Sequence, residues 1–210
     1  MTLYVLALSD APVMPWEEDD GRRIESLPIE GIYAIGERRS DVPAVIEAEL
    51  QRQHAIVQRL ADAVPAIIPA RFGSLVDEEE LSVILRERRP LIETALDHVR
   101  DKVQMTLRIA GVVAPVESAA PASGREYLER RRHVLGPAPP APVEGVLRDL
   151  RSLILDERRK PIERGSLTIY HLVARADVKE YRDVVNAARV AGVAMSGPWA
   201  AFAFAPDLFS

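Results

Sequence analysis

The sequence predicts an α+β protein of two domains, in which short strand patterns and amphipathic helix patterns alternate along the chain. Three observations support this class. Residues 103–109 alternate apolar and polar side chains, residues 45–60 repeat apolar side chains at helical spacing, and no segment of the chain repeats another. With 210 residues and 48% hydrophobic content, the chain can form one large domain or two small ones with a substantial core.

The chain opens with two predicted strands. Residues 2–8 are almost continuously apolar and rich in β-formers, which predicts a central strand. Residues 9–28 hold three prolines and an acidic run, so we expect a solvated loop that Trp16 pins to the body of the protein. The second strand is expected at residues 29–35.

The first long helix is expected to begin at Asp41, which would cap it, with Pro43 in the opening turn. The helical spacing predicts a mostly apolar inner stripe. Its members are Val45, Ile46, Glu49, Leu50, Gln53, Ile56, Val57 and Leu60.

The segment 65–81 organises the first half of the chain. Residues 66–68 predict a short buried strand between two prolines, and Arg71-Phe72-Gly73 then turns the chain. Asp77 with Glu80 three residues later has the pattern of a capping box, which predicts a helix start. A short helix follows, and Pro90 is expected to begin another.

The second half contains one clear strand and two linkers. Residues 103–109 predict a strand with one core face and one polar face. Residues 111–123 are rich in alanine, proline and serine and predict a linker, while 124–135 have a helical pattern. Gly136 to Pro142 predict an extended polyproline spacer.

An αβαβ pattern completes the chain. Residues 143–154 predict a helix and 167–173 a strand. Asp177 is expected to cap the next helix and Gly192 to end it, before a short strand at 193–195. The whole pattern predicts two ferredoxin-like sandwiches with helices on one face of each sheet. We place the domains at 1–102 and 103–210, although the strand at 103–109 could belong to either sheet.

Few residues point to catalysis. The chain has no cysteine, and its four histidines, His54, His98, His133 and His171, fall in four different predicted elements without metal-binding spacing. We therefore expect no metal or cofactor, and the consecutive acids at 77–80 suit a helix start better than an acid/base site. Arg130 to Arg132 could bind phosphate, but an ion-paired, solvated face is the favoured interpretation.

Arg71 and the C-terminal aromatics are the candidate interaction residues. A guanidinium directly after a buried strand either pairs with a carboxylate across the fold or awaits a partner, and structural pairing is favoured. The tail residues Trp199, Phe202 and Phe204 most simply close the core of the second domain. As an exposed patch they would form a hydrophobic docking surface.

Charge and hydropathy argue against a nucleic-acid-binding, secreted or membrane protein. The net charge of −5 provides no general attraction for nucleic acid or an anionic membrane. The N-terminal apolar run is too short and lacks the basic residues of a signal peptide, and no apolar run approaches the ~20 residues of a membrane span. We expect a soluble intracellular protein that binds or assembles rather than catalyses.

Three stretches resemble the gas-vesicle accessory protein L/F family in their order and spacing. They are the I-P-A-R-F-G-S run at 68–74, the D-K-V-Q-M-T-L-R strand at 101–108, and S-G-P-W at 196–199. The sequence departs from the family at Gln104, where glutamate is usual, and after Trp199, where the family continues with prolines and a tyrosine.

The resemblance implies an N-terminal α+β domain, a C-terminal modified ferredoxin-like domain and no known catalysis. It implies a cytoplasmic protein, associated with gas vesicles, that binds the small hydrophobic shell protein and other accessory proteins and helps to nucleate or build the vesicle wall. The candidate partner-binding residues are Arg71, Phe72, Gly73, Pro198, Trp199, Phe202 and Phe204. The alternative is an enzyme or small-molecule-binding protein that uses a cleft near Arg71.

Overall fold

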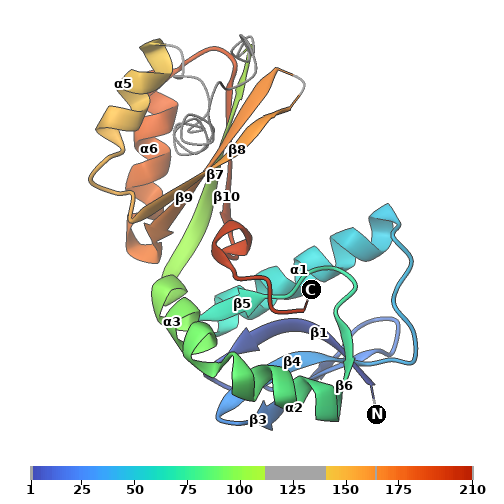
Figure 1. The fold of residues 1–210 in the computed structure, drawn as a ribbon. Coiled ribbons are helices and arrows are strands. Elements are labelled where there is room, and N and C mark those ends of the chain that lie inside the picture. The colour runs from blue at the N-terminus through green and yellow to red at the C-terminus, as the bar shows by residue number, and fades with distance from the viewer. Residues whose placement is uncertain (1, 112–140, 164, 210) are drawn as a thin grey trace, which may run out of the picture. The chain divides into compact units, whose positions relative to one another are not determined.

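The computed structural model describes residues 2–111, 141–163 and 165–209. The chain forms two compact units, one of Met1–Val103 with Trp199–Ser210 and the other of Gln104–Pro198. Each unit contains a sheet and helices (Figure 1). The predicted α+β class is therefore confirmed, while the domain boundaries at residues 102 and 103 stay a prediction.

The first unit is built around the strand β1. Its sheet consists of β1 (Thr2–Ser9), β2 (Trp16–Glu17), β3 (Arg23–Ile29), β4 (Ile32–Arg38), β5 (Ile67–Pro69) and β6 (Leu75–Asp77). The strand order is β2-β3-β4-β1-β5, and β6 also pairs with β1. Because β1 pairs antiparallel with β4 on one edge and with β5 and β6 on the other, it is the central strand that the sequence predicts.

Both faces of β1 are covered. Tyr4 and Leu6 belong to the core cluster that α1 (Glu47–Ala63) closes from one side. Leu3 and Val5 point to the opposite face because side chains alternate along a strand, and they are also fully buried. The helices α2 (Glu78–Glu87) and α3 (Arg89–Val99) bury five further apolar side chains. The expectation of helices on only one face is therefore wrong for this sheet.

The region predicted as a loop before residue 29 contains strand structure. The strands β3 and β4 form a hairpin in which Ile29 pairs with Ile32. The two residues between them, Glu30 and Gly31, have φ angles of 53° and 81°, as a tight I′-type hairpin turn requires. The strand predicted at 29–35 is therefore confirmed as β4 only from Ile32 onward, since the chain reverses at Glu30 and Gly31 and Ile29 belongs to β3. Trp16 packs against the core cluster, as expected.

The first helix begins later than predicted. Asp41 is not its cap, because α1 starts at Glu47 and Ile46 before it is extended, with φ −120° and ψ 156°. Val45 and Ile46 precede the helix and are exposed, and Leu50 is exposed on α1 itself, so none of the three side chains lines the core. The C-terminal part of the predicted stripe is buried as expected, at Gln53, Ile56, Val57 and Leu60.

Helix α2 begins after Asp77, as the sequence predicts. The Asp77 carboxylate accepts hydrogen bonds from the backbone N–H groups of Glu79 and Glu80, at 3.0 and 2.8 Å. These bonds satisfy two of the donors that every helix start leaves free. The sequence did not predict β6, because its three residues are too few to show a strand pattern.

The second unit contains a four-stranded sheet of order β10-β7-β9-β8. Its strands are β7 (Lys102–Ala110), β8 (Asp156–Glu163), β9 (Ser166–Ala174) and β10 (Val193–Trp199), and its helices are α5 (Ala141–Asp149) and α6 (Val178–Ala188). The two helices lie side by side (Figure 1). Met105, Leu107 and Ile109 of β7 enter the core, whereas Arg108 on the other face is exposed, so the predicted alternation is confirmed.

Several boundaries in this unit differ from the prediction. The strand β8 was not predicted, because its sequence DERRKPIE is mostly charged and becomes a strand by pairing with β9. Helix α6 ends at Ala188, where Arg189 takes the left-handed conformation, so Gly192 is not its terminator. The structure does not describe residues 112–140, which hold the predicted first linker from residue 112, the helix predicted at 124–135 and most of the predicted polyproline spacer. The spacer prediction is wrong at Ala141 and Pro142, which form the first turn of α5, where proline is tolerated.

The strand β10 runs through the segment that was predicted to break it. Gly197 permits this in two ways. Its φ of +114° is rarely adopted by other residues, and a Cβ atom on it would lie 2.7 Å from the backbone oxygen of Gln104 on β7. Glycine is therefore required where β10 crosses close to β7.

We predict that Gly197→Ala lowers the free energy of unfolding by about 1–3 kcal/mol, because the substitution imposes backbone strain and a clash. Urea denaturation followed by circular dichroism measures this. Gly145→Ala in α5 is the matched control, since its Cβ meets open space among the described residues. That variant should be neutral or stabilising by up to about 1 kcal/mol. Equal effects of both substitutions would contradict the role assigned to Gly197.

Candidate functional site

A buried polar network fixes the Arg71-Phe72-Gly73 turn to the core of the first unit. The Tyr4 hydroxyl donates to Gln53 Oε1 at 2.5 Å and accepts from the Gly73 N–H at 3.1 Å. Gln53 Nε2 donates to the Ala70 carbonyl at 3.2 Å. Burial raises the pKa of the Tyr4 phenol, so it remains a hydrogen-bond donor. The network joins β1, α1 and the turn and fixes the turn's position.

The side chains of the turn have different environments. Gly73 has a φ of +94°, which favours glycine, and the Phe72 ring meets the Tyr4 ring edge-on with centroids 6.3 Å apart. The Arg71 side chain is 73% exposed and its guanidinium pairs with the Asp207 carboxylate at 2.6 Å. Arg71 thus has the structural partner that the sequence favoured, and it stands on an open surface.

The C-terminal tail packs on the first unit. The Ala200 N–H donates to Gln58 of α1 at 3.2 Å, and Ala200 is part of the core cluster that contains β1. Trp199 and Phe202 lie against His54, with ring centroids 4.9 and 5.9 Å apart, and Phe204 is buried. The expectation that these aromatics close the second domain's core is wrong, since Trp199 and Phe202 lie against α1 and Phe204 lies near His98 of α3.

The structure brings six of the seven candidate residues into the first unit. They are Arg71, Phe72, Gly73, Trp199, Phe202 and Phe204. The Arg71–Asp207 pair connects the turn with the tail, and Arg88 donates to the Asp207 carbonyl at 2.9 Å. Pro198 is the last residue of the second unit, so the division between the two units falls directly after it.

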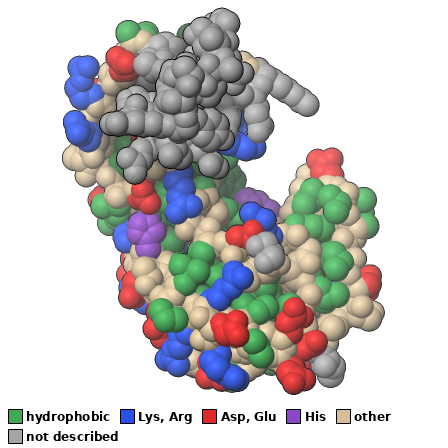
Figure 2. Space-filling model, in the orientation of Figure 1, with side chains coloured by type: hydrophobic (Ala, Val, Ile, Leu, Met, Phe, Trp, Pro, Cys, Tyr) green, Lys and Arg blue, Asp and Glu red, His purple; other side chains and the backbone are tan. Residues whose placement is uncertain are grey.

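Next to the turn lies an apolar patch that the sequence did not reveal. It consists of Val42, Val45, Ile46 and Leu50, whose exposed fractions range from 43% to 78%. Val42 Cγ1 is 3.7 Å from the position that a Cβ on Gly73 would take, so the patch adjoins the turn. Figure 2 shows hydrophobic side chains gathered over the start of α1. The helical pattern placed three of these residues in the core, but Val45 and Ile46 precede α1 and Leu50 is exposed on it.

A buried carboxylate ties α1 to the sheet of the first unit. Glu37 on β4 is 1% exposed and pairs with Arg39 at 3.1 Å and with Arg52 of α1 at 2.6 Å. Arg22 adds a third guanidinium at 3.7 Å. Because three guanidinium groups surround this buried carboxylate, it joins β4 to α1 through ion pairs and has a structural role.

The second unit contains a buried histidine network. His171 is 0% exposed, and its ring nitrogens lie 2.6 Å from the Tyr181 hydroxyl and 3.1 Å from Glu157 Oε2. Arg159 donates to the other Glu157 oxygen at 2.7 Å. The hydrogen bonds from His171 and Arg159 lower the pKa of Glu157 to about 2, and burial raises the pKa of Tyr181. The network ties β8, β9 and α6 together.

The described residues hold no group of three or more histidine, aspartate or glutamate side chains placed to bind a metal ion. His133 and the Arg130 to Arg132 run lie outside them. Within the same ranges, no helix combines the length and apolarity needed to cross a membrane.

Comparison with known proteins decides the family. The model of the gas vesicle synthesis protein GvpL/GvpF family matches residues 2–206. The chain belongs to this family. The resemblance seen in the sequence is thereby confirmed, and the family is one of gas vesicle proteins.

Solved GvpF structures share the fold. The chain is similar to the gas vesicle protein GvpF from Anabaena sp. PCC7120, with 12% identity, a TM-score of 0.72 and 98% of each chain covered. It is also similar to GvpF from Microcystis aeruginosa, with 11% identity, a TM-score of 0.75 and coverage of 98% and 99%. Comparison with curated protein sequences finds no match. At such low identity the solved structures support the GvpF fold, and the family model supports the membership.

We predict that Tyr4→Phe lowers the free energy of unfolding by about 1–3 kcal/mol, because it leaves buried polar groups of Gln53 and Gly73 without their partner. Hydrogen exchange at the Gly73 amide should become faster. Tyr33→Phe is the matched control, since no described residue bonds to the Tyr33 hydroxyl. Unchanged exchange at Gly73 in Tyr4→Phe would argue against the network as the support of the turn.

We predict that Glu157 stabilises the protein above about pH 4.5 and loses this effect as the pH falls through about 2. A carboxylate whose folded pKa is depressed favours folding only while it is ionised. From pH 5 to 2, the free energy of unfolding should fall more steeply for wild type than for Glu157→Gln, by on the order of 2 kcal/mol. Glu180→Gln, at an exposed position on α6, should keep the wild-type slope. Parallel curves for wild type and Glu157→Gln would refute the assignment.

Proposed function

We propose that this protein is a gas vesicle accessory protein that binds the small hydrophobic shell protein and assists nucleation or assembly of the vesicle wall. Its partners are this shell protein and other accessory proteins, and it acts in the cytoplasm in association with gas vesicles. The observation that carries the proposal is the apolar patch of Val42, Val45, Ile46 and Leu50 beside the Arg71 turn, in a member of the gas vesicle family.

The physical argument starts from the shell protein. A very apolar subunit that assembles with itself needs partners that cover its surface before assembly. The patch exposes aliphatic side chains, and their exposure does not stabilise the fold of the accessory protein itself. Burial of the patch against an apolar surface of the shell protein would favour association by roughly 25 cal/mol per Å² of apolar area removed from water. The entropic cost of association is subtracted from this gain.

The seven candidate residues have distinct proposed roles. Arg71 and Phe202 present exposed groups, 73% and 37% respectively, and would contact the partner directly. Phe72, Gly73 and Phe204 would shape the surface from beneath. Trp199 and Pro198 would hold the tail on its course along α1.

We further propose that Gln104–Pro198 is the core of a modified ferredoxin-like domain and that Met1–Val103 forms an α+β sandwich. In support, the described elements of the second unit follow the order β7-α5-β8-β9-α6-β10 along the chain. With the strand order β10-β7-β9-β8, this matches the split βαβ arrangement of ferredoxin-like domains.

The test is capture of the shell protein, co-expressed so that it stays in solution, by the purified protein. Wild type should capture it, whereas Val45→Asp should weaken capture about tenfold or more, because a charge would be placed in an apolar contact. Arg71→Ala and Trp199→Ala should also weaken it. Arg71→Ala suits this test because its exposed ion pair contributes at most about 1 kcal/mol to stability.

Val83→Asp is the matched control, since Val83 is a 42% exposed apolar residue of α2 outside the patch. Circular dichroism establishes that each variant is folded. Equal capture by Val45→Asp and Val83→Asp would remove the patch from the proposal. A folded wild type that captures no shell protein would exclude direct binding and favour the alternative of a small-molecule site near Arg71.

A further inference from the structure

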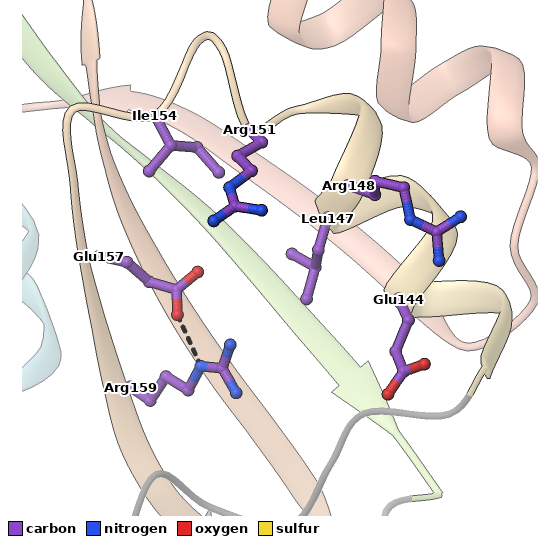
Figure 3. A pocket seen from close by; sticks show the side chains of 7 residues that line it. All are labelled: Glu144, Leu147, Arg148, Arg151, Ile154, Glu157 and Arg159. Atoms are coloured by element: carbon purple, nitrogen blue, oxygen red, sulfur yellow. Dashed lines mark hydrogen bonds and ion pairs between the residues drawn. The ribbon is translucent and has the colours of Figure 1, made fainter.

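We propose that a pocket of the second unit binds an acidic, partly apolar peptide segment of a partner protein. The pocket lies between the end of α5 and the strand β8 and has a volume of about 550 Å³. Figure 3 shows Arg151, Glu157 and Arg159 projecting into the same space from the turn after α5 and from β8. This site is separate from the apolar patch of the first unit and does not depend on the function proposed for that patch.

The pocket contains more cationic groups than its own carboxylates occupy. Of its three arginines, Arg159 is already paired with Glu157 at 2.7 Å. Among the described residues, the guanidinium groups of Arg148 and Arg151 have neither an ion pair nor a hydrogen bond. Two guanidinium groups are therefore available to an anionic ligand, opposite the single remaining carboxylate of Glu144.

In the first unit, the arginine side chains have partners. Every arginine of the first unit, from Arg22 to Arg100, bonds either a carboxylate or a backbone carbonyl. These pairs include side chains as exposed as Arg71. The two unpaired arginines that line one pocket of the second unit thus differ from the arginines of the first unit.

The floor of the pocket is apolar and rests on the core. Leu147 and Ile154 line the pocket and pack against the buried cluster of the second unit, so they are partly exposed and held in place. A floor of this kind accepts an aliphatic side chain between two charged groups. The combination of guanidinium rim and aliphatic floor fits glutamate or aspartate next to leucine-like residues.

The charge of the pocket favours carboxylate over phosphate. Glu144 and Glu157 both line the pocket, and each would repel a phosphate dianion more strongly than a single carboxylate. Glu157 itself is fixed between Arg159 and the buried His171, so this wall is rigid before any ligand arrives. The net charge of −5 adds no attraction for nucleic acid. An acidic peptide is the occupant that these charges favour.

The test measures fluorescence anisotropy of a fluorescein-labelled peptide of alternating glutamate and leucine, added to the full chain at low salt. We expect saturable binding, with Kd raised about tenfold by Arg148→Gln and by Arg151→Gln, since each removes one charge-assisted hydrogen bond. Arg108→Gln is the matched control. Arg108 is exposed, likewise lacks a described partner, and lies on β7 outside the pocket, so its Kd should change less than twofold.

Four results would overturn the proposal. They are the absence of saturable binding to folded wild type, an equal loss in Arg108→Gln, equal binding of a peptide with glutamine in place of glutamate, and displacement of the peptide by an equal concentration of inorganic phosphate. The last would reassign the pocket to phosphate. Because the variants lie outside the apolar patch, their capture of the shell protein should equal that of wild type, which keeps the two proposals distinguishable.

Discussion

The burial of β1 on both faces is the constraint on which the first unit depends. A strand that pairs along both edges and is covered on both faces must be apolar almost throughout, and residues 3–8 are. Its neighbours β4, β5 and β6 take their positions from it, and the turn at 71–73 connects two of them. The turn beside the proposed binding surface is thus attached to the fully buried strand of the unit.

Buried polar networks connect that rigid framework with the surface elements. In the first unit, the Tyr4 hydroxyl reaches from β1 to the turn, and Glu37 joins β4 to α1. In the second unit, His171 joins β9 to α6 and to Glu157 on β8, beside the arginine pocket. A network in a low-dielectric interior fixes geometry because any broken bond leaves an unpaired polar group. Both proposed binding surfaces are therefore supported from beneath by such a network.

The two surfaces differ in chemistry and suit different partners. The patch around Val45 is aliphatic and exposed, which fits an apolar partner such as a shell subunit. The pocket that contains Arg148 and Arg151 is cationic at its rim, which fits an acidic segment. A protein that assembles others benefits from separate contacts, since two linked sites raise the effective concentration of each partner at the other.

The sequence by itself determined the α+β class, the central strand, the helices after Asp77 and Pro90, and the family, because periodic burial and capping are local signals. Only tertiary structure decided the rest. The charged strand β8 exists because β9 pairs with it, and the tail lies on α1 because an apolar surface there receives Ala200. The apolar patch lies where the sequence shows a clear helical pattern, although α1 begins only at Glu47. Helical periodicity predicts which face of a helix is apolar, but it does not predict what covers that face.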